Sequence, residues 1–224
     1  MQVEWHGQSA FRLTDGDTTV FIDPFGDMTA VGARTVRWEY PPIAGVAADL
    51  LLVTHEHRDH NAVEAVGGEP HTIRSRAGRH ATPLGEVVAV ASEHDDAAGT
   101  QRGANTLVAF TLGGLRVAHL GDLGQRALRD EQVAALGPVD LLFLPVGGGP
   151  TQDAEQAAAT AARLGARLVV PMHYRTERID FLDPVDPFLA QFDPAQVQRS
   201  ETPVFQVELP GDGEPPVVVV PAAP

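Results

Sequence analysis

Residues 49–60 read Asp49-Leu50-Leu51-Leu52-Val53-Thr54-His55-Glu56-His57-Arg58-Asp59-His60, an apolar run that ends directly in three histidines and an aspartate. A continuous apolar run of this length is typical of a strand that is buried on both faces of a sheet. A sharp turn after such a strand lets His55 and His57 reach one point in space. Asp59 and His60 can then turn toward a second point nearby. Neutral imidazoles and a carboxylate suit Zn²⁺, Mn²⁺ or Fe²⁺, so the stretch predicts a metal site rather than a solvated turn.

The composition is that of an ordinary globular chain with an acidic balance. Its 224 residues are 43% hydrophobic and 21% charged, so they can bury a core and are expected to form a single domain over residues 1–224. Acidic residues outnumber basic ones by 30 to 16, and the net charge of −14 argues against a nucleic-acid partner. Cysteine is absent, which excludes disulfides and thiolate metal sites. Any metal must therefore be bound by nitrogen and oxygen.

The N-terminal sequence has neither a basic leader nor an apolar segment. No later stretch stays apolar over the ~20 residues that a membrane span needs. We therefore expect a cytoplasmic protein that does not enter a membrane. Its expected partner is a small-molecule substrate, and the sequence leaves open whether the chain forms a homo-oligomer.

The first half of the chain is rich in short segments that are typical of strands. Residues 2–5, 9–13 and 18–23 predict an N-terminal meander, with Asp15-Gly16-Asp17 as the turn between the last two. Residues 24–48 are interrupted by glycine and proline and predict irregular structure, and a short helix is expected at 62–66. Further strands are expected at residues 49–54, 71–75, 86–92, 106–112 and 116–120.

From residue 125 onward, helices and strands alternate. Helices are expected at residues 125–136 and 153–164, and strands at 139–144 and 167–170. The alternation predicts crossovers packed on a sheet, with Asp153 capping the second helix and Gly165 ending it. A short helix at 187–192 and strands at 204–208 and 217–220 follow, and residues 221–224 are expected to fray. The pattern predicts an α/β fold of two sheets with outer helices.

Three further candidate ligands follow apolar strands downstream: His94 in Ser92-Glu93-His94-Asp95, Asp122 in His119-Leu120-Gly121-Asp122, and His173 in Pro171-Met172-His173-Tyr174. Together with the first stretch they resemble the metallo-β-lactamase superfamily, in which a His-x-His-x-Asp-His motif precedes a histidine, a bridging aspartate and a final histidine. Asp23 matches the early aspartate of that superfamily, which usually lies near the metals. The resemblance extends to about residue 176. It implies a four-layer αββα sandwich of two mixed β-sheets flanked by helices.

Within the superfamily the chain is similar to the ascorbate-6-phosphate-lactonase-like branch of small metal-dependent hydrolases. The matching segments are Trp5-His6-Gly7-Gln8-Ser9-Ala10-Phe11, Phe21-Ile22-Asp23-Pro24-Phe25, His119-Leu120-Gly121-Asp122, Pro145-Val146-Gly147-Gly148 and Pro171-Met172-His173-Tyr174. One position differs, because branch members often have Gly-His-Ser where this chain has Gly7-Gln8-Ser9.

The resemblance also implies which residues bind two divalent metal ions. One ion is held by His55, His57 and His94, the other by Asp59, His60 and His173, and Asp122 bridges them. Zinc is the first choice, with manganese or iron as alternatives, and the nucleophile is a hydroxide between the ions. Asp59 is then the catalytic residue that orients this hydroxide and moves its proton. His119, Tyr174 and Arg102 are candidates for contacting the substrate.

Other polar residues near these motifs are expected to have different roles. His71 and His80 have no partner motif and are expected at the surface or in structural contacts, and Asp95 and Asp96 are expected to be solvated. Gly147-Gly148-Gly149 resembles a phosphate-binding loop, but the chain contains no lysine, so a tight turn or a close backbone approach is expected. His6 stays open as a residue that lines the pocket, and residues 177–186 are expected to form a lid-like surface segment.

The predicted function is metal-dependent hydrolysis of a small ester, lactone or phosphodiester. An oxygen- or nitric-oxide-reducing diiron enzyme of this fold would have glutamate in place of His57. A nuclease or other phosphodiesterase of the superfamily that acts on nucleic acid is disfavoured by the charge of −14. A metal-binding protein of the same fold without turnover stays open, because a motif does not by itself establish catalysis.

Overall fold

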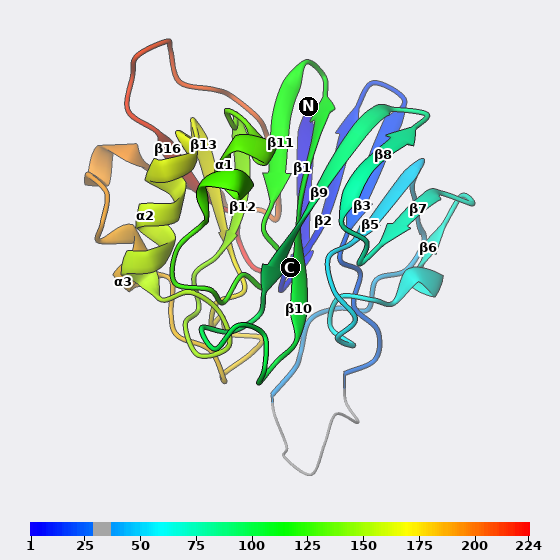
Figure 1. The fold of residues 1–224 in the computed structure, drawn as a ribbon, viewed down its shortest axis with the longest axis horizontal. Coiled ribbons are helices and arrows are strands. Elements are labelled where there is room, and N and C mark those ends of the chain that lie inside the picture. Colours follow the sequence, from blue (N-terminus) through cyan, green and yellow to red (C-terminus); the bar gives the residue numbers. More distant parts are fainter. Residues whose placement is uncertain (29–36) are drawn as a thin grey trace.

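Two mixed β-sheets packed face to face form the centre of the computed structural model, which describes residues 1–28 and 37–224 (Figure 1). The six-stranded sheet has the order β15-β1-β2-β3-β5-β7. Its strands are β1 (Gln2–Gly7), β2 (Ala10–Asp15), β3 (Thr18–Ile22), β5 (Leu50–Val53), β7 (His71–Arg74) and β15 (Val204–Gln206). Strands β1, β2 and β3 form the predicted antiparallel meander, and β3, β5 and β7 run parallel to one another.

The eight-stranded sheet has the order β14-β16-β13-β12-β11-β10-β9-β8. Its strands are β8 (Gly78–Thr82), β9 (Gly85–Glu93), β10 (Ala104–Leu112), β11 (Leu115–His119), β12 (Leu141–Pro145), β13 (Leu168–Met172), β14 (Val197–Arg199) and β16 (Val217–Val220). Two short strands, β4 (Val46–Ala47) and β6 (Val66–Gly67), pair beside the six-stranded sheet. Since β11, β12 and β13 are mutually parallel, their carboxyl ends lie at one edge.

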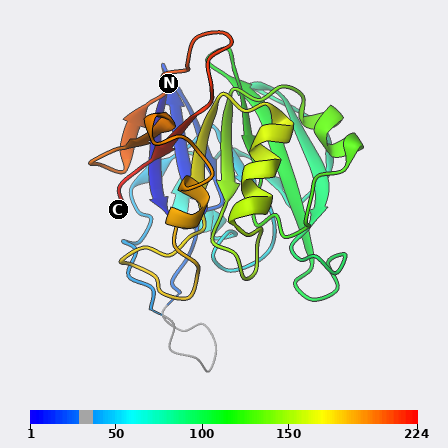
Figure 2. The same ribbon diagram turned by 90° about the vertical axis from the view of Figure 1, so that its left-hand side faces the viewer.

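The helices lie on the outer face of the eight-stranded sheet. They are α1 (Asp130–Leu136), α2 (Ala154–Leu164) and α3 (Asp186–Leu189), and Figure 2 shows α2 lying along the sheet with α3 beside it. The predicted ends of α2 are confirmed, because the Asp153 side chain accepts a hydrogen bond from Gln156 N and Gly165 has a left-handed backbone with φ 59°. Within residues 1–28 and 37–224, no helix is both long and apolar enough to span a bilayer.

The core between the sheets is built by strands whose inward side chains meet. In β1 the alternate residues Val3 and Trp5 are buried, whereas β5 and β12 are buried along their whole length. Phe11 of one sheet packs against Phe143 of the other, with ring centroids 4.4 Å apart and the rings tilted by 44°. Burying such a ring stabilises the fold by about 1.5–3 kcal/mol.

The outer face of the six-stranded sheet has a different cover. Phe25, Tyr40 and Ile43 pack there with Ile179 and Leu182 of the segment expected to be a lid. In the part of the chain that the structure describes, this layer consists of loops, the short strands β4 and β6, and the 3₁₀ turn η1 (Val63–Ala65). The predicted fold class is confirmed, with α-helices concentrated on one side of the sandwich. The predicted irregular segment 24–48 lies in part outside the described residues.

Several predicted boundaries were wrong. Helix α1 begins at Asp130 rather than at residue 125, because the Gln125 side chain bonds Ala127 O at 2.7 Å and holds a turn there. The predicted helix at 62–66 is the single turn η1, and the one at 187–192 is α3. Strands β8 and β14 and the 3₁₀ helix η2 (Pro194–Gln196) had not been expected. The C-terminal residues do not fray, since Ala222 N bonds Thr202 O at 3.2 Å and Pro224 O accepts from Arg178 Nε at 2.9 Å.

Candidate metal centre

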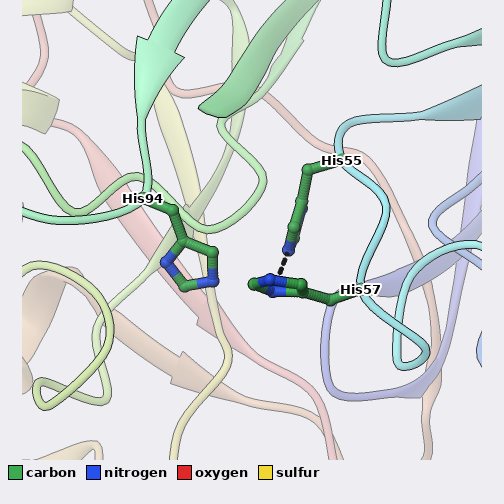
Figure 3. Close-up of side chains that lie close together, drawn as sticks. All are labelled: His55, His57 and His94. Atoms are coloured by element: carbon green, nitrogen blue, oxygen red, sulfur yellow. Dashed lines mark hydrogen bonds between the residues drawn. The ribbon is translucent and has the colours of Figure 1, made fainter. Parts of the chain in front are cut away.

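Three histidines form a first cluster at the edge where the strands end. His55 and His57 follow β5, and His94 follows β9. The ring centroids of His55 and His57 are 4.6 Å apart, and each lies 4.9 Å from that of His94. Figure 3 shows the three rings close together, and a dashed line joins His55 to His57. The distance between His55 Nε2 and His57 Nδ1 is 3.1 Å. Each ring offers a nitrogen to one region, so the first cluster could hold a metal ion.

Asp59, His60, Asp122 and His173 form a second cluster. One ligand atom of each lies within 4.8 Å of the others. His60 Nε2 is 3.5 Å from Asp59 Oδ2 and 3.3 Å from Asp122 Oδ1. This nitrogen and oxygen set could hold a second ion.

Asp122 lies between the two clusters. Its Oδ2 is 3.1 Å from His94 Nε2 and 3.8 Å from His55 Nε2, both in the first cluster. The same oxygen is 3.2 Å from His173 Nε2 in the second cluster. The structure therefore brings all seven sequence-predicted ligands to one place, with Asp122 in contact with both sets.

Two atoms of the second cluster are better placed to bind a cation than to form a hydrogen bond with each other. His60 Nε2 and Asp122 Oδ1 are buried and have no hydrogen-bond partner among the described residues. Buried polar atoms in proteins are normally bonded, and each exception calls for an explanation such as a bound ion. A divalent cation within reach of both atoms satisfies them, so the residues present fit a metal.

In three of the histidines the ring nitrogen that faces away from the clusters, Nδ1, is held by the surrounding chain. His60 Nδ1 lies 2.9 Å from Asp23 Oδ2, His55 Nδ1 lies 3.1 Å from Thr54 Oγ1, and His94 Nδ1 lies 3.0 Å from Pro150 O. Thr54 in turn donates its hydroxyl to Asp23 Oδ2 at 2.7 Å. Because each Nδ1–H is engaged in this way, the Nε2 lone pair faces the cluster. Asp23 therefore orients the ring of His60, a candidate ligand.

The electrostatic environment favours a positive charge at the second cluster. Burial lowers the pKa of His60, but the carboxylates of Asp122, Asp59 and Asp23 outweigh it and raise that pKa well above its ordinary value. A metal ion at the same point meets the same negative potential. Burial lowers the pKa of His55 to about 3, so this ring is neutral and can offer a lone pair at pH 7.

The backbone is strained where the second cluster is assembled. Asp23 and His173 have left-handed conformations, with φ of 50° and 51°. For residues other than glycine such a conformation costs roughly 1–2 kcal/mol. Strain of this kind persists where the surroundings over-determine it, and it gathers at functional sites.

Glycines allow backbone segments to approach the candidate ligands closely. A Cβ on Gly124 would overlap the His94 carbonyl, and a Cβ on Gly147 would overlap the His173 carbonyl. The triple glycine at 147–149 therefore provides the close backbone approach that the sequence predicted.

Gly147→Ala is expected to displace His173 and to reduce metal-dependent turnover by about 100-fold, the effect of a misplacement of about 1 Å at a reacting centre. The matched control is Gly165→Ala at the end of α2, because a Cβ there meets nothing within 4 Å although φ is 59°. The control should lose stability but keep its turnover. Steady-state rates and urea unfolding of both variants test this prediction. Equal turnover in the two would show that the close approach of Gly147 to the His173 carbonyl is unimportant.

Glu56 links the loop of residues 55–60 to neighbouring residues through hydrogen bonds. Its carboxylate accepts hydrogen bonds from Arg74 Nη2 at 2.6 Å, Ser75 Oγ at 2.7 Å and Asn61 Nδ2 at 3.2 Å. The bonds from Arg74, with smaller contributions from Ser75 and Asn61, lower the pKa of Glu56 to about 2.

Glu56→Gln is expected to cost up to about 1 kcal/mol of unfolding free energy at pH 7, since the ion pair is largely exposed. Because the folded-state pKa is depressed, the contribution is present above the ordinary pKa of 4.5 and is lost as the pH falls through about 2. The stability difference between wild type and variant should therefore shrink below pH 4.5. Urea unfolding across this range tests it, with the exposed Glu201→Gln as control; a difference that is constant with pH would contradict the assignment.

The other residues singled out from the sequence lie outside the two clusters. His119 is fully buried, with Nε2 2.9 Å from Ser9 O and Nδ1 accepting from Gly121 N at 3.1 Å, so it does not face a substrate. Tyr174 is buried against the Trp5 ring at 5.5 Å, and burial raises its pKa. Arg102 is exposed, and His6 packs on Phe21 at 5.1 Å.

The expectation that Asp95 is solvated was wrong. The side chain is buried and accepts four backbone N–H groups, from Ala97, Gly99, Gln101 and Arg102. It therefore organises the loop that follows His94. Asp96 is half-exposed and pairs with Arg126 at 3.1 Å, His71 is exposed, and His80 bonds Arg76 O at 2.8 Å.

Two residues of the site had not been identified from the sequence. Thr54 links Asp23 to His55, and its place as the last residue before the motif was the available signal. Gln8 is fully buried, and its Nε2 lies 3.2 Å from Asp59 Oδ2. Its departure from the branch pattern was noted, but that position gave no indication of the contact.

Comparison with known proteins agrees with this geometry. The family model of the β-lactamase superfamily domain matches residues 2–173. A UPF0173 metal-dependent hydrolase of Geobacillus sp. is 30% identical over 215 residues, which cover 82% of this chain and 90% of the relative. A crystal structure from Thermotoga maritima, described as that of a candidate Zn-dependent hydrolase of the metallo-β-lactamase superfamily, has a TM-score of 0.78 and 32% identity over 98% of both chains.

A more distant structure shows the fold alone. An isothiocyanate hydrolase from Delia radicum gut bacteria has a TM-score of 0.63 at 16% identity, covering 85% of this chain and 91% of its own. The superfamily inferred from the motif is thus confirmed by sequence and by structure. The chain belongs to the metallo-β-lactamase superfamily and is one of its metal-dependent hydrolases.

Proposed function

We propose that the protein cleaves a small ester, lactone or phosphodiester with two divalent cations held by its seven clustered side chains. His55, His57 and His94 would hold one cation, Asp59, His60 and His173 the other, and Asp122 would be shared. The observation that carries the proposal is the position of Asp122 Oδ2, 3.1 Å from His94 Nε2 and 3.2 Å from His173 Nε2. One carboxylate oxygen in contact with both clusters is the arrangement that a bridging ligand requires.

Two cations, when bound, supply a water of lowered pKa and stabilise the negative charge that develops during hydrolysis. The protein's own contribution is positional, because Asp23, Thr54 and Pro150 hold three of the imidazoles in fixed orientations. Asp59 is suited to hold and move a proton. Its side chain is 19% exposed, whereas that of Asp122 is 3% exposed, so Asp59 can reach a bound substrate.

Zinc is the proposed metal, with manganese or iron as alternatives, since the set combines imidazole nitrogens with carboxylate oxygens. The description of the Thermotoga maritima relative as a candidate Zn-dependent hydrolase supports this order. We also propose a cytoplasmic enzyme of small molecules. The net charge of −14, which disfavours polyanionic substrates such as nucleic acid, supports a small-molecule substrate.

The test is a substrate screen of the metal-free chain reloaded with Zn²⁺, Mn²⁺ or Fe²⁺. Aryl esters, lactones and bis(p-nitrophenyl) phosphate represent the three classes, and turnover of at least one should depend on metal. Asp59→Asn should reduce that turnover by about 100-fold to 10,000-fold, the range of general acid–base catalysis. Asp96→Asn, at a half-exposed neighbouring position, should leave it unchanged. Metal bound without turnover of any class, or full activity in Asp59→Asn, would refute the proposal.

A further inference from the structure

A buried glutamine lies behind the second cluster. Gln8 follows β1, is fully buried, and donates from Nε2 to Asp59 Oδ2 over 3.2 Å. We infer that Gln8 is a positioning residue, which orients Asp59 and His173 and so sets the affinity of the second metal position. The inference rests on the proposed two-metal function.

The backbone aims this side chain at Asp59. Gly7 and Gln8 both have left-handed conformations, with φ of 107° and 52°, which break the alternation of β1. Gly7 packs against Tyr40 so closely that a Cβ there would lie 2.5 Å from Tyr40 Cδ1. The turn is therefore fixed by packing on one side, and it places Gln8 at the carboxyl end of β1, where the clusters lie.

The main chain of Gln8 also contacts the second cluster. Its carbonyl oxygen accepts from Trp5 Nε1 at 3.0 Å and from His173 N at 3.3 Å. Gln8 therefore touches Asp59 through its side chain and His173 through its backbone. Its hydrogen bonds in the described part of the chain include none to His55, His57 or His94. Substitution of Gln8 should therefore change the metal affinity of the second cluster and leave that of the first cluster unchanged.

The amide suits this role chemically. An ionised carboxylate accepts only, so the amide must present its N–H₂ group to Asp59. It donates without adding charge and at every pH, and it does not compete for the cation as an imidazole or a carboxylate would. A side chain with the sole task of filling the core would be apolar there, because a buried amide with unsatisfied atoms is destabilising.

The side chain of Gln8 makes fewer hydrogen bonds than that of Gln132, a buried glutamine with a structural role. Gln132 accepts from Gln125 Nε2 at 2.7 Å and from Arg129 N at 2.8 Å, and donates to Ala91 O at 2.8 Å. Gln8 Oε1, in contrast, is buried and has no hydrogen-bond partner among the described residues. The bond to Asp59 is thus its principal side-chain contact, which points to the site rather than to stability.

The experiment compares Gln8→Met with Gln132→Met, two substitutions that replace a buried amide by a side chain of similar size. Zn²⁺ is titrated into each metal-free protein in competition with a chromophoric chelator, which resolves two affinities. Gln8→Met should keep one affinity and weaken the other by about 10–100-fold, as loss of an outer partner of a metal ligand does. Gln132→Met should keep both. Co²⁺ absorption spectra should show the same loss at one position, independently of activity.

Wild-type affinity for one Zn²⁺ shows that the variant is folded. If Gln8→Met does not fold, Gln8→Asn tests the same point, since asparagine tolerates left-handed backbone but is one methylene shorter. Wild-type affinity at both positions in the Gln8 variant would overturn the inference. So would equal losses at both positions together with a loss of stability like that of Gln132→Met. A wild-type chain that binds a single Zn²⁺ would instead refute the proposed two-metal function before any variant is made.

Discussion

Asp122→Ala is expected to reduce hydrolysis to the rate of the uncatalysed reaction. Its Oδ2 lies 3.1 Å from His94 Nε2, 3.2 Å from His173 Nε2 and 3.8 Å from His55 Nε2, so its removal takes away a carboxylate that contacts both clusters. Asp122→Asn keeps the shape but removes the charge, and it should lose as much. Turnover and bound metal per chain, measured on the same preparations, test this.

Asp140→Asn is the matched control for Asp122. Asp140 accepts from Arg116 N at 2.8 Å and precedes β12, at the end of the strand opposite the clusters. This variant should change stability but neither turnover nor metal content. Substantial hydrolysis in Asp122→Ala with both metals still bound would show that Asp122 is not the shared ligand.

Removal of metal by chelation is expected to abolish turnover and to lower the thermal midpoint by about 8–16 °C. A ligand present at 1,000 times its Kd stabilises the folded state by about 4 kcal/mol. For a chain of this size each kcal/mol shifts the midpoint by about 2–4 °C. The unpartnered atoms His60 Nε2 and Asp122 Oδ1 supply the physical reason, since a cation satisfies both.

Calorimetry before and after chelation, with metal analysis of each sample, measures this effect. Re-addition of Zn²⁺, Mn²⁺ or Fe²⁺ should restore both the midpoint and the rate, and the order of recovery ranks the metals. Full turnover in a sample that contains no detectable metal would contradict the account.

The meeting of the seven side chains could be predicted from the sequence. Residues 55–60 form one motif, and His94, Asp122 and His173 each follow an apolar strand. The mutually parallel strands β11, β12 and β13 end at the same edge, which brings residues far apart in the chain together. The apolar strands before these residues are visible in local sequence, but the full ligand set was predicted from the resemblance to the metallo-β-lactamase superfamily.

The supporting contacts could not be predicted, because each depends on tertiary geometry. The side chain of Gln8 is aimed by a left-handed backbone that its sequence does not require. Asp95 looks like a solvated residue in a polar loop until that loop folds back to give it four N–H groups. The C-terminal residues are held by Thr202 and Arg178, which nothing in the tail itself indicates.

Anomalous scattering at the zinc edge from a crystal of the Zn²⁺-loaded protein tests the central claim most directly. We predict two peaks, one within bonding distance of His55, His57 and His94, the other within bonding distance of Asp59, His60 and His173, with Asp122 reaching both. A single peak, or peaks bound by other residues, would contradict it.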